Sequence, residues 1–310
     1  MEGKRTGTLD PDFGRALGGR VLPPRKSQRA VEEVDPAQIP ARSAVALDNA
    51  VFKPPFLGSR VAKGISLDDI ATYLNETALF RNQWQYRPAG ESDEEFKARI
   101  RPTLRSELAK AKEVGSLVPA VAWGYFPVNA DGNDLIVWTD DDRTEERMRF
   151  MFPRQRKEPW QSIADFFRPV ESGEGDYAAF HVVTMGDIAS VHAAELFAAN
   201  QYQDYLHFHG LSVEMAEALA EYWHRRIREE WGFADEDGPT LGGLFKQQYR
   251  GSRYSWGYPA CPDLDDQVKV ADLLEVDRIG VTVSEEFQLH PEQSTSAIVV
   301  HHPEAKYFIV

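Results

Sequence analysis

The sequence predicts an α+β fold in which helices flank one mostly antiparallel sheet. Apolar, β-rich runs come in neighbouring pairs joined by short turns, as in hairpins. Amphipathic helical segments also come in pairs, without the strand–helix–strand alternation of a parallel sheet. No internal repeat or further boundary is visible after residue 45, so we expect residues 46–310 to form a single domain.

The first 45 residues differ in composition from the rest. Residues 1–29 carry seven basic and three acidic side chains, although the net charge of the whole chain is −14. Gly and Pro are scattered through this segment, and no helical or strand period appears. We therefore expect residues 1–45 to be a flexible basic tail or linker, with a basic arm for an acidic partner as the alternative.

The predicted helices begin at clear capping signals. Ser66 and Ser92 each precede a helical pattern and have an acidic residue three positions later, which predicts a capped helix start at both. After Ser92, apolar residues repeat every four positions, so one face of that helix should be buried. Pro102 should kink or divide this helix, and Gly115 should end it.

The strands are predicted from apolar runs between turn residues. Residues 120–128 and 134–138 lie on either side of an Asp-Gly turn, which predicts a β-hairpin. Residues 147–152 and 178–185 predict two further strands. The C-terminal part predicts a helix over 270–276 and short strands over 280–284, 296–300 and 306–310.

Two amphipathic helices are predicted over residues 186–209 and 212–231, separated by Gly210, with Ser212 capping the second. The first is expected to bury Ile188, Val191, Ala194, Ala198, Tyr202 and Tyr205. The second is expected to bury Ala216, Leu219, Ala220, Trp223 and Ile227.

Composition excludes several classes of protein. One cysteine allows neither a disulfide framework nor a cysteine-ligated zinc site. The start of the chain lacks the apolar segment of a secretion signal, and no run approaches the roughly 18 apolar residues of a membrane span. The net charge of −14 disfavours nucleic acid, whose phosphates bind clustered Lys and Arg. We expect a cytoplasmic protein that binds neither nucleic acid nor membranes.

Signatures of catalytic and metal sites are absent from the sequence. It has no dinucleotide-binding glycine motif, Walker loop or nucleophile elbow. The side chains of His207-Phe-His209 and of His301-His302 should point apart, which favours helix-end or surface histidines over metal ligands. Four polar residues share one face of the 212–231 helix and alone predict its solvent side: Glu217, Glu221, His224 and Arg228. No catalytic residue and no metal ligand is assigned.

One stretch, "RGSRYSWGYPACPD" at residues 250–263, shows neither a helix nor a strand period. Arg253 carries a planar fork that can bind a carboxylate through two hydrogen bonds. Gly257 would let a ligand approach the bare backbone. These residues fit a pocket for a zwitterionic small molecule with an aromatic part, and they equally fit a surface loop with a structural salt bridge.

The same stretch resembles a known motif. "YRGSRYSWGYPACPD" is similar to R-x-x-x-G-Y-P-A-C-P, the S-adenosylmethionine (AdoMet) binding motif of the reactivation domain of cobalamin-dependent methionine synthase. "LNETALFRNQWQY", "AEALAEYWHRRIREEWGF" and "HPEAKYFIV" resemble other landmarks of that domain, so the resemblance runs from about residue 50 to the end. It implies a helmet-shaped domain with a twisted antiparallel sheet.

The resemblance also implies a set of AdoMet-binding positions. Arg253 falls on the carboxylate-binding arginine, and Gly257 and Tyr258 fall on the backbone that meets the nucleoside. Asn75 stands where the family has an acidic contact, so it brings no charge against the ammonium of the ligand. Phe308 lacks the hydroxyl of the second tyrosine of a pair, and Tyr254-Ser255-Trp256 replaces a small Pro-Ala-Pro. The implied set is Asn75, Glu217, Arg253, Ser255, Gly257, Tyr258, Tyr307 and Phe308.

In function, the resemblance implies the reactivation module of a methyltransferase of methionine biosynthesis. Such a module docks over cobalamin held by a partner module, and the methyl group of AdoMet, with an electron from flavodoxin or an equivalent reductase, restores methylcobalamin from cob(II)alamin. The D-x-H-x-x-G cobalamin motif and a cysteine zinc site are absent, so we expect no methionine synthesis by this chain alone. The alternatives are a non-catalytic AdoMet-sensing or cobalamin-capping module, and an independent AdoMet-dependent methyltransferase with another acceptor.

Overall fold

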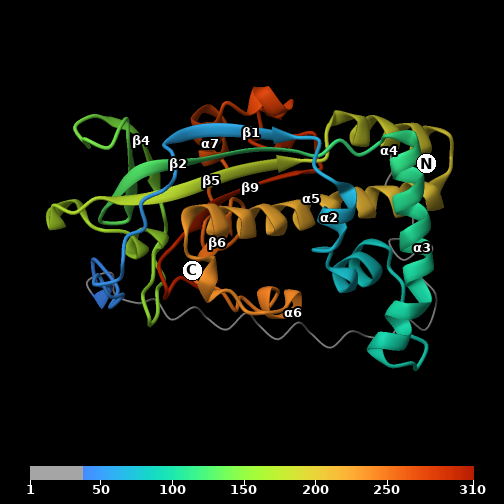
Figure 1. Ribbon diagram of the computed structural model, residues 1–310, viewed down its shortest axis with the longest axis horizontal. Helices are drawn as coiled ribbons and strands as arrows, with labels where there is room; N and C mark the ends of the chain where they lie inside the picture. The colour runs from blue at the N-terminus through green and yellow to red at the C-terminus, as the bar shows by residue number, and fades with distance from the viewer. Residues whose placement is uncertain (1–37) are drawn as a thin grey trace, which may run out of the picture. The chain divides into compact units, whose positions relative to one another are not determined.

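Seven strands form one antiparallel sheet within residues 38–310, the part of the chain that the computed structural model describes (Figure 1). Their order is β4-β3-β2-β5-β9-β6, and β1 pairs with the first half of the long β2. The strands are β1 (Gly58–Lys63), β2 (Ala120–Asp131), β3 (Asp134–Trp138), β4 (Glu146–Met151), β5 (Asp176–Thr184), β6 (Ser252–Ser255) and β9 (Ser294–Val300). A separate small hairpin consists of β7 (Thr282–Val283) and β8 (Leu289–His290).

Six α-helices of the described part accompany the sheet: α2 (Leu67–Ala71), α3 (Asp93–Val114), α4 (Asp187–Ala198), α5 (Tyr202–Trp231), α6 (Leu241–Leu244) and α7 (Asp266–Leu274). A π-helical segment covers Ala78–Gln83. Four 3-10 segments cover Ile163–Phe166, Val170–Ser172, Ala234–Glu236 and Val276–Ile279. The α+β architecture with an antiparallel sheet agrees with the fold class that the sequence predicts.

The sheet has a hydrophobic core on each face because its strand residues alternate between the two sides. In β5, Ala179 and Val183 join the core that α5 covers, whereas Ala178, Phe180 and Val182 join the core that α7 covers. Figure 1 shows α5 running along the sheet on one side and α7 on the other. The central strand β5 is buried along its whole length.

Several predicted elements are confirmed. Ser92 and Glu95 form a complete capping box at the start of α3, and Gly115 ends that helix in the left-handed region at φ 69°. The β2–β3 hairpin turns at Gly132, β4 and β5 lie where the apolar runs predict them, and α7 covers most of the predicted 270–276 helix. Pro102 does not divide α3, which is continuous over 22 residues.

The predicted break at Gly210 is wrong. Helix α5 runs through Gly210, and the chain instead breaks near Asn200, which has a φ of 59°. A Cβ atom at position 210 would lie 2.8 Å from Cβ of Gln83 and 3.0 Å from Cδ1 of Trp84. This glycine therefore allows the segment around Trp84 to pack closely against α5, rather than ending a helix.

The predicted buried face of the first helix is also wrong, since Ala194 and Ala198 are exposed and Tyr205 is only partly buried. Ile188, Val191 and Tyr202 are 51%, 49% and 56% exposed, whereas Ala189 and Ala193 are buried. The five residues predicted for the second helix, from Ala216 to Ile227, are all buried. These residues recur at helical spacing along the continuous helix α5, so they share its buried face.

Two predictions about the C-terminal third are also wrong. Residues 252–255 form the edge strand β6, in which Tyr254 is buried in the α7-side core while polar side chains occupy the other face and hide the strand period. Residues 306–310 form no strand; Lys306 instead donates from Nζ to the carbonyl oxygen of Tyr249 at 2.6 Å.

The histidines predicted for helix ends or the surface are mostly buried. His207 lies inside α5 and is buried, and His301 and His302 have almost no exposed area. Nε2 of His301 lies 2.7 Å from the buried carboxylate of Asp176. Within residues 38–310, no three His, Cys, Asp or Glu side chains are grouped closely enough to hold a metal ion.

The start of the domain lies before residue 45. Arg42 donates to the carbonyl oxygens of Asp165 and Phe167, the main-chain N–H of Ser43 donates to Asp165, and Val45 is buried. These contacts place residues 42–45 in the domain rather than in the predicted tail. Residues 1–37 lie outside the described part of the chain.

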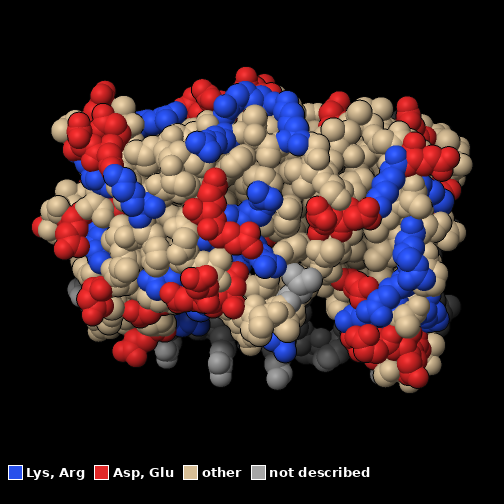
Figure 2. Space-filling model, viewed as in Figure 1, with Lys and Arg blue, Asp and Glu red and all other residues tan. Residues whose placement is uncertain are grey.

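The described surface mixes charges of both signs. On the face drawn in Figure 2, acidic and basic side chains of the described residues are interspersed rather than separated into fields. No helix among residues 38–310 combines the length and the apolar character that a bilayer crossing requires.

Candidate functional site

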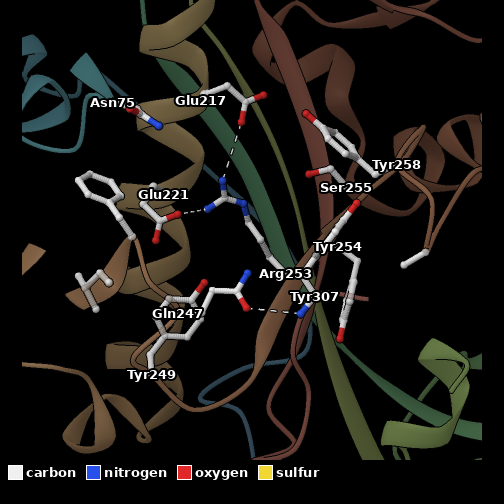
Figure 3. A pocket seen from close by; sticks show the side chains of 13 residues that line it. Asn75, Glu217, Glu221, Gln247, Tyr249, Arg253, Tyr254, Ser255, Tyr258 and Tyr307 are labelled. Atoms are coloured by element: carbon white, nitrogen blue, oxygen red, sulfur yellow. Dashed lines mark hydrogen bonds and ion pairs between the residues drawn. The ribbon is translucent and has the colours of Figure 1, made fainter. Parts of the chain in front are cut away.

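A pocket of about 300 Å³ opens beside Arg253, where β6, α5 and the C-terminal segment meet (Figure 3). Six of the eight residues named from the sequence line it: Asn75, Glu217, Arg253, Ser255, Tyr258 and Tyr307. They come from four separate segments of the chain, and the fold brings them together.

The orientation of Arg253 follows from its place in β6. It is paired with Val299 of β9, so its side chain points to the sheet face that α5 covers, while the next residue, Tyr254, points to the opposite core. Glu217 and Glu221 are four residues apart on α5, so both carboxylates lie on the helix face above the guanidinium. The sheet register and the helix period together form the site.

Arg253 is held by both glutamates. Its Nη1 donates to Oε2 of Glu221, and its Nη2 lies 3.8 Å from Oε2 of Glu217. The Glu221 and Arg253 side chains are 13% and 18% exposed, whereas Glu217 is 43% exposed. Burial alone would lower the pKa of Arg253, but the charges of Glu221 and Glu217 outweigh it and raise that pKa. The guanidinium is therefore a permanent cation between two carboxylates.

The polar face of α5 is wrongly assigned to solvent in the sequence interpretation. His224 and Arg228 have no exposed area, and Arg228 is bonded through Nη2 to Asp237 at 2.7 Å. This face packs toward β6 and the segment before it. A helical wheel cannot distinguish a solvated face from one that lines a polar site, because the two have the same residue types.

Asn75 presents its amide nitrogen, not its oxygen, as the free group. Its Oδ1 accepts a hydrogen bond from the main-chain N–H of Ala78 at 3.1 Å, at the start of the π-helical segment. In Figure 3 the nitrogen of Asn75 points into the pocket. Asn75 thus offers the pocket a donor and no negative charge.

Tyrosines form part of the pocket wall and rim. The carboxylate of Glu217, with burial second, raises the pKa of Tyr258. Burial, with Glu221 second, raises the pKa of Tyr249 to about 12. Both phenols therefore remain neutral near pH 7 and can act as hydrogen-bond donors or as aromatic surface.

Several pocket residues are missed by the sequence interpretation: Glu221, Leu244, Phe245, Gln247, Tyr249, Tyr254 and Ala260. Glu221 had a usable signal, because it follows Glu217 by one helical turn. Gln247 and Tyr249 lie in an irregular segment whose position depends on Lys306, which donates to both of their carbonyl oxygens. No local pattern predicts such a contact across nearly 60 residues.

Two of the named residues lie outside this pocket. Phe308 is buried against Phe166 and Tyr254, with ring centroids 6.2 and 5.7 Å apart, and it belongs to the core. Gly257 has a φ of 87°, a conformation that favours glycine, and it lines a second groove of about 600 Å³. Tyr258 lines both cavities, so one half-exposed tyrosine separates the pocket from the groove.

Comparison with known proteins finds relatives of this chain. Residues 68–310 match the family model described as "Vitamin B12 dependent methionine synthase, activation domain". Over 300 residues the chain is 49% identical to a methionine synthase of Mycobacterium tuberculosis (strain ATCC 25618 / H37Rv) and 46% identical to one of Mycobacterium leprae (strain TN). Each alignment covers 91% of this chain and 25% of the relative, so the chain spans about a quarter of the length of these relatives.

A crystal structure of the MetH reactivation domain bound to AdoHcy has a similar fold. Its TM-score to this chain is 0.77 at 27% sequence identity, and the match covers 85% of each chain. The match therefore supports the same overall fold for most of this chain.

Proposed function

The chain belongs to the family of vitamin B12-dependent methionine synthase activation domains, and from this we propose that it binds AdoMet in the Arg253 pocket as a reactivation module. Its task would be to supply the methyl group for the reductive methylation of cob(II)alamin held by a partner module. The observation that carries this proposal is the pocket itself, in which one partly buried arginine lies between two glutamates beside exposed aromatic side chains.

The residues present fit an AdoMet ligand in charge and shape. The ligand combines a carboxylate with two cationic groups, an ammonium and a sulfonium. Arg253 suits the carboxylate through its planar fork, and the two glutamates suit the cations. Tyr258 and Tyr307 offer exposed aromatic faces, which favour a nearby cation by about 0.5–2 kcal/mol and also stack on heterocycles. The volume of about 300 Å³ is at the lower end of small-molecule sites.

In this proposal the acceptor approaches from the groove beyond Tyr258. Several amide and hydroxyl side chains line it: Gln267, Gln288, Ser294, Thr295 and Ser296. AdoMet supplies a methyl group already activated by its sulfonium, and the reduced cobalamin supplies the nucleophile, so no acid or base is required. The role of this chain would be to hold the methyl group of AdoMet in line with the cobalt of the reduced cobalamin. Flavodoxin or an equivalent reductase would supply the electron.

Calorimetric titration of AdoMet into the chain tests the binding step. The proposal predicts saturable binding of one ligand per chain, with AdoHcy as a competitor. Adenosine alone should bind more weakly than AdoMet, because it lacks the carboxylate that is proposed to bind Arg253. Absence of AdoMet binding by the folded chain would contradict the proposal.

A further inference from the structure

Glu221 uses only half of its hydrogen-bonding capacity. Its Oε2 accepts from Arg253, but its Oε1 is buried and has no hydrogen-bond partner among the described residues. Buried polar atoms are nearly always partnered, since leaving one unpaired is unfavourable. An unpartnered carboxylate oxygen beside a ligand pocket therefore indicates a position for a donor that a ligand brings.

The other acceptors of the pocket are less suited to a cationic donor. Oδ1 of Asn75 is already bonded to Ala78, and Oε1 of Gln247 accepts from the main-chain N–H of Tyr307 at 3.4 Å. Both side chains are also neutral. Glu217 is negatively charged, but its greater exposure to water weakens its attraction for a cation. Glu221 is the more buried of the two carboxylates that flank Arg253.

The geometry of an α-amino acid matches this arrangement. Its carboxylate and its ammonium are separated by a single carbon atom. A ligand carboxylate on Arg253 therefore brings the ammonium next to whatever already surrounds the guanidinium. Glu221 is in direct contact with that guanidinium and is fixed on the middle of the long helix α5.

We propose that Glu221 accepts the α-ammonium of the ligand, so that Arg253 and Glu221 together recognise an amino-acid zwitterion. The proposal rests on the proposed function, since it assigns a subsite within the same pocket. The ligand enters an existing ion pair: its carboxylate binds the arginine, its ammonium binds the glutamate, and no buried charge is left without a partner. This arrangement makes Glu221, and not Asn75, the anionic partner of the ammonium in this chain.

Two probes that differ only in the amino group test the assignment. They are AdoHcy and its desamino analogue, S-(3-carboxypropyl)-5′-thioadenosine, titrated calorimetrically into the full chain and into Glu221→Gln. The full chain should bind AdoHcy at least about tenfold more tightly than the analogue. In Glu221→Gln this ratio should fall below about threefold, because the ammonium loses its anionic partner. A purely structural role would weaken both probes equally and leave the ratio unchanged.

Glu229→Gln is the matched control. Glu229 lies on the same helix, is half exposed and, among the described residues, pairs with Arg225 alone at 2.9 Å, so this variant should keep the full ratio. If the ratio persists in Glu221→Gln, or is lost in Glu217→Gln alone, the assignment to Glu221 is wrong although the proposed function stands. If the unmodified chain binds neither probe, the proposed function fails and the subsite fails with it.

A second variant covers the case in which Glu221→Gln does not fold. Glu221→Asp keeps the charge but withdraws it by one methylene group. It should therefore lower the AdoHcy-to-analogue ratio only in part, and an unchanged ratio in this variant would overturn the proposal.

Discussion

At the level of single residues, the sequence identifies the centre of the site but not its surroundings. Arg253 is predictable because it stands at a fixed distance from Gly257 and Tyr258 in a recognisable motif. Its partner Glu221 belongs to another element, and the contact depends on the register of β6 against β9. The donor orientation of Asn75 is likewise invisible in the sequence, because it is set by the bond to Ala78.

Replacing Arg253 tests its role as the carboxylate-binding residue. We predict that Arg253→Ala weakens AdoMet binding by about 2–5 kcal/mol, or roughly 30-fold to several thousand-fold, because the ligand carboxylate loses a charge-assisted partner. Arg253→Lys should restore only part, since an ammonium cannot form the bidentate fork. Calorimetric titration of AdoMet into the three proteins measures the effect.

Arg250 is the neighbouring arginine for comparison. It does not line the pocket; its Nε donates to the carbonyl oxygen of His301 at 2.9 Å and its Nη1 pairs with Glu236 at 2.7 Å. Arg250→Ala should therefore lower thermal stability while leaving AdoMet affinity within about threefold. Equal loss of affinity in both alanine variants would show that Arg253 acts through folding alone.

Two buried histidines below the pocket predict a dependence of stability on pH. Burial, with the charge of Arg253 second, lowers the pKa of His181 to about 3, and burial also holds the pKa of His224 well below its ordinary value. The native state therefore keeps both rings neutral where the unfolded chain, with a pKa near 6.5, binds protons. Their stabilising contribution is complete above about pH 6.5 and is lost as the pH falls.

Chemical denaturation between pH 7 and pH 5 checks this dependence. Once the pH lies below 6.5, each histidine should contribute a slope of up to about 1.4 kcal/mol per pH unit to the free energy of unfolding. His181→Asn should remove one such contribution. A variant with the same slope as the unmodified chain would show that His181 is protonated in the folded state.

At the level of elements, hairpins and capped helices are predictable, whereas helix boundaries set by packing are not. The β2–β3 hairpin and the start of α3 follow from local turn and capping residues. The continuity of α5 through Gly210 depends on the close approach of Trp84, which no local pattern contains. The same applies to β6, whose polar site-facing residues obscure its period.

Gly210→Ala tests this account of α5. Alanine has the higher helix propensity, by about 1 kcal/mol, but its Cβ would be too close to Gln83 and Trp84. We expect overpacking to outweigh propensity and to lower the free energy of unfolding by about 1–2 kcal/mol. Gly242→Ala in α6, where an added Cβ meets no atom within 4 Å, should be neutral or slightly stabilising. A stabilised Gly210→Ala variant would mean that the contact with Trp84 is loose.

At the level of the whole molecule, the fold class and the family are predictable because the landmarks of the resemblance occur in order along the chain. The N-terminal boundary is less predictable. Residues 42–45 have the composition of a linker, yet they contact the 163–168 region through Asp165 and Phe167. A few hydrogen bonds from a short segment leave no periodic signal in the sequence.

Two truncations test this boundary. From the composition of the basic segment we predict that deleting residues 1–37 changes the melting temperature by less than about 2 °C. Deleting residues 1–45 should lower it by several degrees, because Asp165 loses Ser43 and Arg42 as partners. Thermal denaturation of both truncations decides the boundary: equal melting temperatures would place residues 38–45 outside the stable domain.

In the proposed function, this chain donates the methyl group of AdoMet to cobalamin on a partner module. The most direct test of this function is single-turnover transfer of a labelled methyl group from AdoMet to a cobalamin-loaded methionine synthase module, in the presence of a low-potential reductant. We expect labelled methylcobalamin and AdoHcy in equal amounts, with transfer strongly reduced in Arg253→Ala at AdoMet concentrations that saturate the unmodified chain. AdoMet binding without transfer would instead support a sensing or capping module, and transfer to another acceptor without cobalamin would support an independent methyltransferase. Either result would contradict the proposed function.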